Sequence, residues 1–310
     1  MTISALAVIL PGMVKKFLVG RAEIFSLNIA TAQRSFEQVA EIFPSVPTVE
    51  LEEAFRSLST GKEGGSMGWA FNAALIRLPG HCILVDTGFG FTSGAQGVGM
   101  LQLITEAGIS TEEITAVVIT HGHGDHVGGL VNVGGLVNVG ELVEEGRPTM
   151  PQARLVISRA EHRFYMEGEA ARIMGEESIQ VQKAGFSAYS DRTDRIDSDG
   201  EIAASGDTTV RAIQASGHTP GHIGLEILSE GERFWLLVDT LHAPFQLDHP
   251  DWVPRYDHDP DQARRTRIDL LKRAADEEIP VMLYHFPFPG VGMIRAAGEV
   301  FSFEKQGEEI

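Results

Sequence analysis

The segment "THGHGDHVGG", residues 120–129, places four potential metal ligands within six residues: His121, His123, Asp125 and His126. Imidazole nitrogens and carboxylate oxygens are the ligands that zinc and similar divalent ions take in proteins. Alternate residues of an extended backbone project to one side, so His121 and His123 can face one ion while the following turn carries Asp125 and His126. A solvated polar turn is the alternative, but the density of ligand-type side chains favours a metal site.

The glycine-rich stretch "GGLVNVGGLVNVG", residues 128–140, follows directly. A phosphate-binding loop is the rival interpretation, but the stretch lacks the Lys and the Ser or Thr that contact phosphate and magnesium in such loops. Gly128 and Gly129 are expected to let the backbone pass close to the metals. Residues 128–133 are repeated as 134–139, and we expect this duplication to lengthen the connection and to form part of the active-site rim.

Short apolar runs rich in β-branched residues end at side chains capable of chemistry, which predicts strands whose ends carry a site. The capping-box spacing of Ser110 and Glu113 predicts a brief helical turn, and Asp259 and Pro260 begin a helix that ends before Pro280. Strands mixed with helices indicate an α/β chain. The expected strands are 73–78, 82–85 before Asp86, 114–120 before His121, 208–215 before His218, 233–238 before Asp239, and 279–284 before His285.

Composition limits the classes of function. The chain has 310 residues, 43% of them hydrophobic, and a net charge of −18, so it is long enough for a large core and repels nucleic acids and anionic membranes. The single cysteine, Cys82, lies in an apolar run and is expected to be a buried thiol. No segment is long enough to span a bilayer. The sequence favours a cytoplasmic location, although an export signal upstream of residue 1 would change this.

Five motifs in order resemble the metallo-β-lactamase superfamily: "VDTG" (85–88), "THGHGDHVGG", "GHTPGH" (217–222), "LVDT" (237–240) and "YHFPFPG" (284–290). The resemblance implies an αββα sandwich with two divalent ions, zinc first and Mn, Fe or Co as alternatives. It implies residues 61–310 as the catalytic domain and leaves residues 1–60 as an N-terminal extension on the core or on a partner subunit, which is compatible with a homodimer. The implied ligands are His121, His123 and His218 for one ion, Asp125, His126 and His285 for the other, and Asp239 between them, with Asp86 and His222 as supporting residues.

The resemblance also implies hydrolysis by a metal-bridging hydroxide. His123 stands where redox members carry Glu, and Asp239 stands where many β-lactamases carry Cys. The C-terminal block resembles the branch of methyl parathion hydrolases and quorum-quenching lactonases. Asp125 and His242 are the candidate catalytic residues, the first as a proton relay and the second as a group that polarises substrate or merely packs.

The expected substrate is a small, neutral or weakly charged ester-like molecule, first a lactone of the acyl-homoserine type. An organophosphate triester, a β-lactam and a non-catalytic metal-containing binding scaffold are the alternatives. Large aromatic residues near the motifs can line a pocket for an acyl or aryl group, with burial in the core as the alternative. These residues are Trp69, Phe71, Phe245, Trp252, Phe286 and Phe288.

Overall fold

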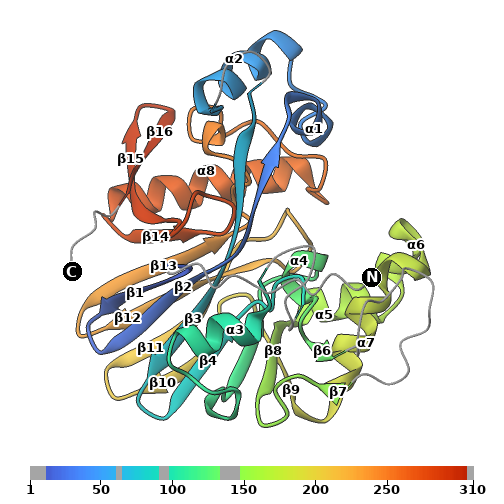
Figure 1. Cartoon of the computed structure of the whole chain (residues 1–310), viewed down its shortest axis with the longest axis vertical. Helices are drawn as coiled ribbons and strands as arrows, with labels where there is room; N and C mark the ends of the chain where they lie inside the picture. The colour runs from blue at the N-terminus through green and yellow to red at the C-terminus, as the bar shows by residue number, and fades with distance from the viewer. Residues whose placement is uncertain (1–11, 61–64, 91–97, 133–146, 306–310) are drawn as a thin grey trace, which may run out of the picture.

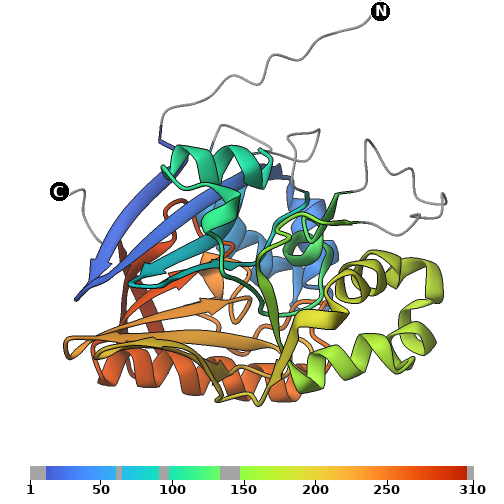
Figure 2. The same cartoon turned by 90° about the horizontal axis from the view of Figure 1, so that it is seen from below.

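The computed structural model describes residues 12–60, 65–90, 98–132 and 147–305. They form two seven-stranded sheets packed face to face, with helices outside them (Figures 1 and 2). The αββα sandwich expected from the sequence is therefore confirmed. The second repeat copy, residues 134–139, lies outside the described residues.

The first sheet contains antiparallel strands from the N-terminal part of the chain and parallel strands from its middle. Residues 14–34 of the N-terminal extension supply its first two strands, and the second of these pairs along almost the whole length of β3, with one register shift. In spatial order the sheet is β1 (Val14–Val19), β2 (Ala22–Arg34), β3 (Met67–Leu78), β4 (His81–Val85), β5 (Ala116–Ile119), β8 (Arg154–Ser158) and β9 (Thr193–Ile196).

The second sheet follows chain order and contains one parallel pair, β13 with β14. Its strands are β10 (Glu201–Ser205), β11 (Thr208–Gln214), β12 (Ile223–Ser229), β13 (Glu232–Val238), β14 (Pro280–Leu283), β15 (Val291–Ala297) and β16 (Val300–Lys305). A separate short pair joins β6 (Val131–Asn132) to β7 (Arg147–Pro148). All six strands expected from the sequence are present, with ends that differ by up to six residues, the largest difference being at the start of β3.

Helix α8 crosses the outer face of the second sheet and α3 that of the first, while α5 to α7 lie at one end of the sandwich (Figure 2). As expected, Asp259 caps α8 by accepting from the Gln262 backbone N–H, and Glu113 accepts from the Ser110 N–H at 2.8 Å. The α-helices are α1 (Phe36–Ile42), α2 (Thr48–Leu58), α3 (Met100–Glu106), α4 (Gly124–Val127), α5 (Arg159–Met166), α6 (Glu169–Met174), α7 (Gln180–Ala188) and α8 (Pro260–Asp276). Short 3-10 helices cover Thr111–Glu113, Glu176–Ile179, Ser190–Arg192 and Pro244–Gln246.

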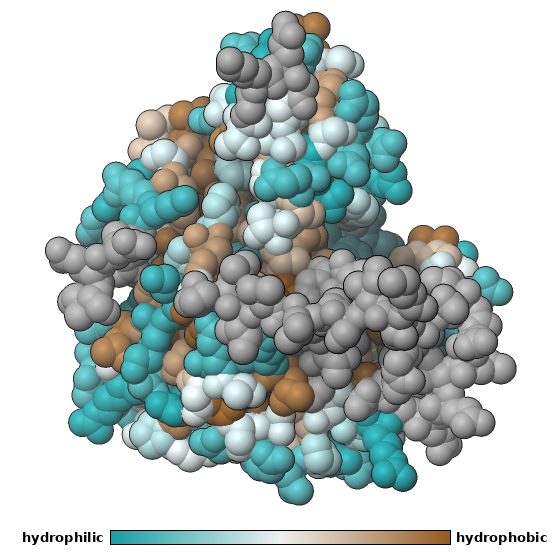
Figure 3. Space-filling model, viewed as in Figure 1, coloured by the Kyte–Doolittle hydropathy of each residue, from teal (hydrophilic) through white to brown (hydrophobic). Residues whose placement is uncertain are grey.

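Strand β13 shows how sequence alternation builds the two apolar layers. Phe234 and Leu236 point into the core between the sheets, whereas Trp235 and Leu237 pack in the core under α8, because successive side chains of a strand point to opposite faces. Cys82 is buried, as expected. The face seen in Figure 3 mixes hydrophilic residues with smaller hydrophobic patches. Within the described ranges, no helix is both long and apolar enough to cross a membrane.

Candidate metal centre

Strand ends and the loops beyond them bring the ligand-type side chains together. His121 follows β5, while Asp239 and His285 follow the adjacent parallel strands β13 and β14. Val238, the last residue of β13, has a φ of 47°, which is a strained conformation for a β-branched residue. The strain lies directly before Asp239, where it sets the direction in which that carboxylate leaves the sheet.

The first cluster contains three imidazoles and one carboxylate, from His121, His123, His218 and Asp239. Nδ1 of His123 lies 3.1 Å from Nε2 of His121 and 2.9 Å from Nε2 of His218. Asp239 Oδ2 is 3.7 Å from the His121 nitrogen and 3.5 Å from the His218 nitrogen. Ligand atoms around a tetrahedral ion with bonds of about 2.0 to 2.2 Å are separated by roughly 3.3 to 3.6 Å. The spacing therefore fits one divalent ion.

The second cluster contains Asp125, His126, His285 and again Asp239. Asp239 Oδ2 lies 3.4 Å from Nε2 of His126 and 3.2 Å from Nε2 of His285. Asp125 Oδ2 lies 3.5 Å and 3.8 Å from the same two nitrogens. One oxygen of Asp239 thus faces both clusters, which is the position of a bridging ligand.

Among the buried side-chain atoms of the described residues that have no hydrogen-bond partner, two belong to the clusters: His126 Nε2 and Asp239 Oδ1. Such atoms are rare in proteins unless an ion or water occupies the site. Burial holds the pKa of His121 and of His218 well below the usual value and lowers that of His123 to about 4, so these imidazoles are neutral and keep a lone pair for an ion at pH 7. The residues therefore fit two divalent ions.

Asp86 supports the second cluster from behind. Its Oδ2 atom lies 2.8 Å from Nδ1 of His126, and the same carboxylate accepts the Thr120 backbone N–H at 2.9 Å. Accepting from Nδ1 fixes the tautomer in which Nε2 of His126 faces the cluster. The sequence motif suggested a supporting role for Asp86, and these are the contacts through which it would act.

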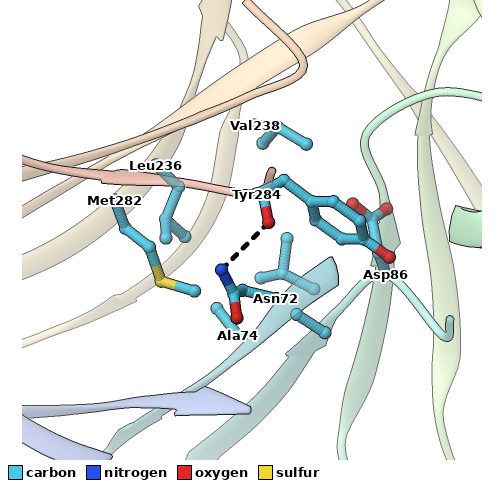
Figure 4. Close-up of a pocket in the computed structure, with 9 residues that line it drawn as sticks. Asn72, Ala74, Asp86, Leu236, Val238, Met282 and Tyr284 are labelled. Atoms are coloured by element: carbon cyan, nitrogen blue, oxygen red, sulfur yellow. Dashed lines mark hydrogen bonds between the residues drawn. The ribbon is translucent and has the colours of Figure 1, made fainter. Parts of the chain in front are cut away.

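Tyr284 and Asn72 complete this support within a small interior cavity (Figure 4). The Tyr284 hydroxyl donates to the Asp125 backbone oxygen at 2.6 Å, and its ring lies 4.2 Å from that of His126. The Asn72 side chain donates to the backbone oxygens of Tyr284 and Phe286. The cavity lies between the sheets, behind the ligands, so these residues hold the ligand loops in place.

Asp257 supports His218 in the same way. Its Oδ1 atom lies 2.8 Å from Nδ1 of His218, and its Oδ2 atom lies 3.2 Å from the buried guanidinium of Arg267. Burial raises the pKa of Asp257, and the neighbouring Arg267 opposes the rise. Sequence analysis missed both residues, because neither the loop before α8 nor the charged face of that helix carries a signal of burial.

His222 and His242 both lie beside the ligand rings. The Nδ1 atom of His222 is 3.0 Å from the Ala215 oxygen, and its ring is 5.1 Å from that of His121. His242 places Nε2 at 3.5 Å from Asp239 Oδ2 and stacks on His285 with ring centroids 5.3 Å apart. His242 therefore lies at the carboxylate shared by both clusters.

The candidate pocket aromatics fall into two groups. Trp69 Nε1 is 3.0 Å from Nδ1 of His285, and the Phe71 ring is 5.2 Å from the His285 ring, so both border the second cluster. Phe245 and Trp252 pack together between the sheets and the N-terminal helices. Phe286 packs on Phe303 in the core under α8, and Phe288 is half-buried.

Comparison with known proteins places this geometry in a family. The metallo-beta-lactamase superfamily model matches residues 69–280, more than half of the chain. Metallo-beta-lactamase domain-containing protein 1 of Mus musculus is 37% identical over 78 residues, 25% of this chain and 26% of that protein. Anti-Pycsar protein Apyc1 of Saccharibacillus brassicae is 42% identical over 59 residues, 19% of this chain and 21% of that protein. These matches span about a quarter or less of either relative.

Solved structures match over nearly the whole chain. AidC, described as a dizinc quorum-quenching lactonase, has a TM-score of 0.78 and 24% identity over 96% of this chain and 98% of its own. The hydrolase AbOPH of the beta-lactamase superfamily has a TM-score of 0.79 and 23% identity over the same shares. At these identities the likeness concerns the fold. With the family model matched over most of the sandwich, the chain belongs to the metallo-β-lactamase superfamily.

Proposed function

We propose that this protein is a hydrolase that holds two divalent metal ions, zinc first, and cleaves a neutral ester-like substrate, first a lactone of the acyl-homoserine type. The observation that carries the proposal is Asp239 Oδ2, which lies within 3.7 Å of ligand nitrogens from both clusters. AidC, described as a dizinc lactonase, has the same fold. Bound ions would supply a hydroxide nucleophile at neutral pH and stabilise the negative charge that develops on the substrate oxygen.

In this proposal the chain's own residues would hold the two ions, orient the ligand imidazoles and carry a proton to the leaving group. His121, His123 and His218 hold one ion, Asp125, His126 and His285 hold the other, and Asp239 joins them. Asp86 and Asp257 accept from Nδ1 of a ligand imidazole and so keep its Nε2 directed at the ion. Both supports act by holding the ligand geometry before substrate arrives.

Asp125 is the candidate proton carrier. Its side chain is 19% exposed, whereas that of Asp239 is 3% exposed, so Asp125 is the ligand carboxylate that a substrate can approach. Opening a lactone releases an alkoxide that requires a proton. The hydroxyl group added to the carbonyl carbon gives up its proton as the carboxylate product forms, and Asp125 at the open edge of the site is placed to pass that proton to the alkoxide.

His242 is the second candidate catalytic residue. Its Nε2 atom lies 3.5 Å from Oδ2 of the shared carboxylate and its side chain is 3% exposed, so it would meet a substrate oxygen only inside the site, beside Asp239. His242→Gln should lower kcat/KM by about a hundredfold if the imidazole assists proton transfer. His249→Gln is the matched control, because His249 stacks on Trp252 away from the clusters. An unchanged kcat/KM for His242→Gln would show that His242 packs in the site and takes no part in catalysis.

A phosphotriesterase is the second candidate function. His242 favours it, because the resemblance to triesterase-like members includes a histidine at this position, and a hydroxide nucleophile attacks phosphoryl as well as carbonyl centres. The net charge of −18 gives no steering to anionic substrates, so a neutral triester suits the protein better than a phosphate monoester.

A substrate panel on one metal-loaded preparation tests the proposal. We expect kcat/KM for an N-acyl homoserine lactone to exceed the values for an aryl ester, an aryl phosphotriester and a cephalosporin. Negligible lactone turnover beside efficient turnover of the triester would identify a phosphotriesterase instead, and beside efficient turnover of the β-lactam it would identify a β-lactamase. Two bound ions without turnover of any substrate would support the binding scaffold instead.

A further inference from the structure

Glu161 is a fully buried carboxylate in α5 that touches both loops of the first cluster. Its Oε1 atom accepts the Gly122 backbone N–H at 2.8 Å. Its Oε2 atom accepts the Thr219 hydroxyl at 2.7 Å and the Gly221 N–H at 2.9 Å. Gly122 lies between His121 and His123, and Thr219 directly follows His218. One carboxylate therefore joins the segments that carry all three imidazoles.

Further hydrogen bonds from neighbouring residues hold the two loop segments that Glu161 contacts, one at Gly122 and one at Gly221. The Gln182 side chain on α7 donates to the Gly122 oxygen at 2.7 Å. The Ser158 hydroxyl donates to the Gly221 oxygen at 2.6 Å and accepts the Glu161 backbone N–H at 3.1 Å. The start of α5 is thus fastened to the loop that carries His218.

Packing at the two glycines shows how closely the loops approach α5. A Cβ atom at Gly221 would lie 2.1 Å from the Glu161 nitrogen, and one at Gly122 would lie 2.2 Å from the Tyr165 ring. Any side chain at either position would push a ligand loop away from the helix. The close approach leaves the carboxylate of Glu161 little freedom in where it holds the two loops.

We propose that Glu161 is a positioning residue that sets the distance between the His121–His123 segment and His218, and thereby the affinity of this cluster for its ion. The inference rests on the proposed metal-binding function. The His121 and His123 segment comes from the first half of the sandwich and His218 from the second, so their relative placement needs a link such as this. A preorganised ligand set binds its ion more tightly, because less order is imposed on binding.

Glu161→Gln is the direct test. The amide keeps the size of the carboxyl group but offers one acceptor oxygen where three donors converge. At least one of the three hydrogen bonds is therefore lost. Removing such a supporting contact typically weakens metal affinity about 10- to 100-fold. Competition with a chromogenic chelator at pH 8 measures the affinity of each ion in turn, independently of turnover. We expect the affinity for one ion to fall by that factor and the affinity for the other to be unchanged.

His285→Ala identifies the affected ion, because it removes a ligand of the second cluster only. In that background one ion should remain bound, and adding Glu161→Gln should lower the affinity for this remaining ion. Glu226→Gln is the matched control: Glu226 is also buried and accepts from Trp235 at 2.9 Å, from Arg233 at 2.8 Å and from Arg211 at 2.6 Å, all on strands of the second sheet. It should lower thermal stability and leave both ion affinities as in the wild type.

Thr219→Val is the alternative test if Glu161→Gln does not fold, because it removes only the hydrogen bond from the Thr219 hydroxyl to Glu161. It should weaken the same ion by a smaller factor, whereas Thr208→Val, which removes a buried hydroxyl bonded to Ser229 at 2.6 Å, should not. Two tightly bound ions in Glu161→Gln, or equal losses in Glu161→Gln and Glu226→Gln, would overturn the positioning role. A wild-type protein that binds fewer than two ions would instead overturn the proposed function and the inference together.

Discussion

The carboxylate of Asp257 lies 2.8 Å from Nδ1 of His218 and also binds the buried guanidinium of Arg267. Asp257→Asn should weaken ion binding at the first cluster roughly tenfold, because the amide cannot accept from His218 and Arg267 at once. Asp257→Ala should also destabilise the fold by about 3 to 5 kcal/mol, because it leaves the charge of Arg267 unpaired. Chelator competition and urea unfolding measure these effects. Asp269→Asn on the exposed face of α8 is the control, and equal behaviour of the two Asn variants would contradict the role of Asp257.

Tyr284→Phe isolates the support given to the loop of Asp125. The variant loses the hydrogen bond to the Asp125 backbone oxygen but keeps the ring on His126. Losing this hydrogen bond at a partly buried oxygen should cost about 1 kcal/mol, while the metal content stays at the wild-type value. Thermal denaturation and elemental analysis provide the two readings, with the exposed Tyr256→Phe as control. An unchanged Tm would show that the hydrogen bond contributes nothing to stability.

The metal-free protein should lose stability as the pH falls, in part through His222. Burial lowers the pKa of His222 from 6.5 to about 4. A lowered histidine pKa means that the folded state takes up the proton less readily than the unfolded state. The free energy of unfolding therefore falls progressively as the pH drops from 6.5, where the unfolded state begins to bind the proton, to about 4, where the folded state binds it too. The shift corresponds to roughly 3 kcal/mol. Urea unfolding between these pH values should show a shallower loss for His222→Gln, and an equal slope would exclude His222 as a contributor.

Removal of the ions should destabilise the protein, because ions that bind only the folded state stabilise it by mass action. At a free-ion concentration of 1,000 Kd this amounts to about 4 kcal/mol per site. Chelation should therefore lower the Tm by several degrees, and added zinc should restore it. Asp239→Ala should gain much less from zinc, and a wild-type Tm that does not respond to either treatment would contradict metal binding.

Sequence patterns placed the candidate ligands at the ends of apolar β-branched runs, and a sheet fixes the positions of its strand ends. The division of these ligands between two ions came from the family resemblance. Glu161 and Asp257 were missed for a physical reason. In "RAEHRF" and "RYDHDP" an acidic residue among charged neighbours has the pattern of an exposed surface, and only tertiary packing buries it. The same limit applies to the aromatic residues: Trp69 and Phe286 are both large and apolar, and only the fold separates the first, beside His285, from the second, under α8.

The count of tightly bound ions in the wild type, Asp239→Ala and His218→Ala tests the dinuclear centre most directly. Asp239 faces the ligands of both clusters, whereas His218 faces one. Elemental analysis and chelator competition should give two ions in the wild type, weakening of both in Asp239→Ala, and weakening of mainly one in His218→Ala. One ion or none in metal-replete wild-type protein, or the same single-site loss in both variants, would contradict a centre bridged by Asp239.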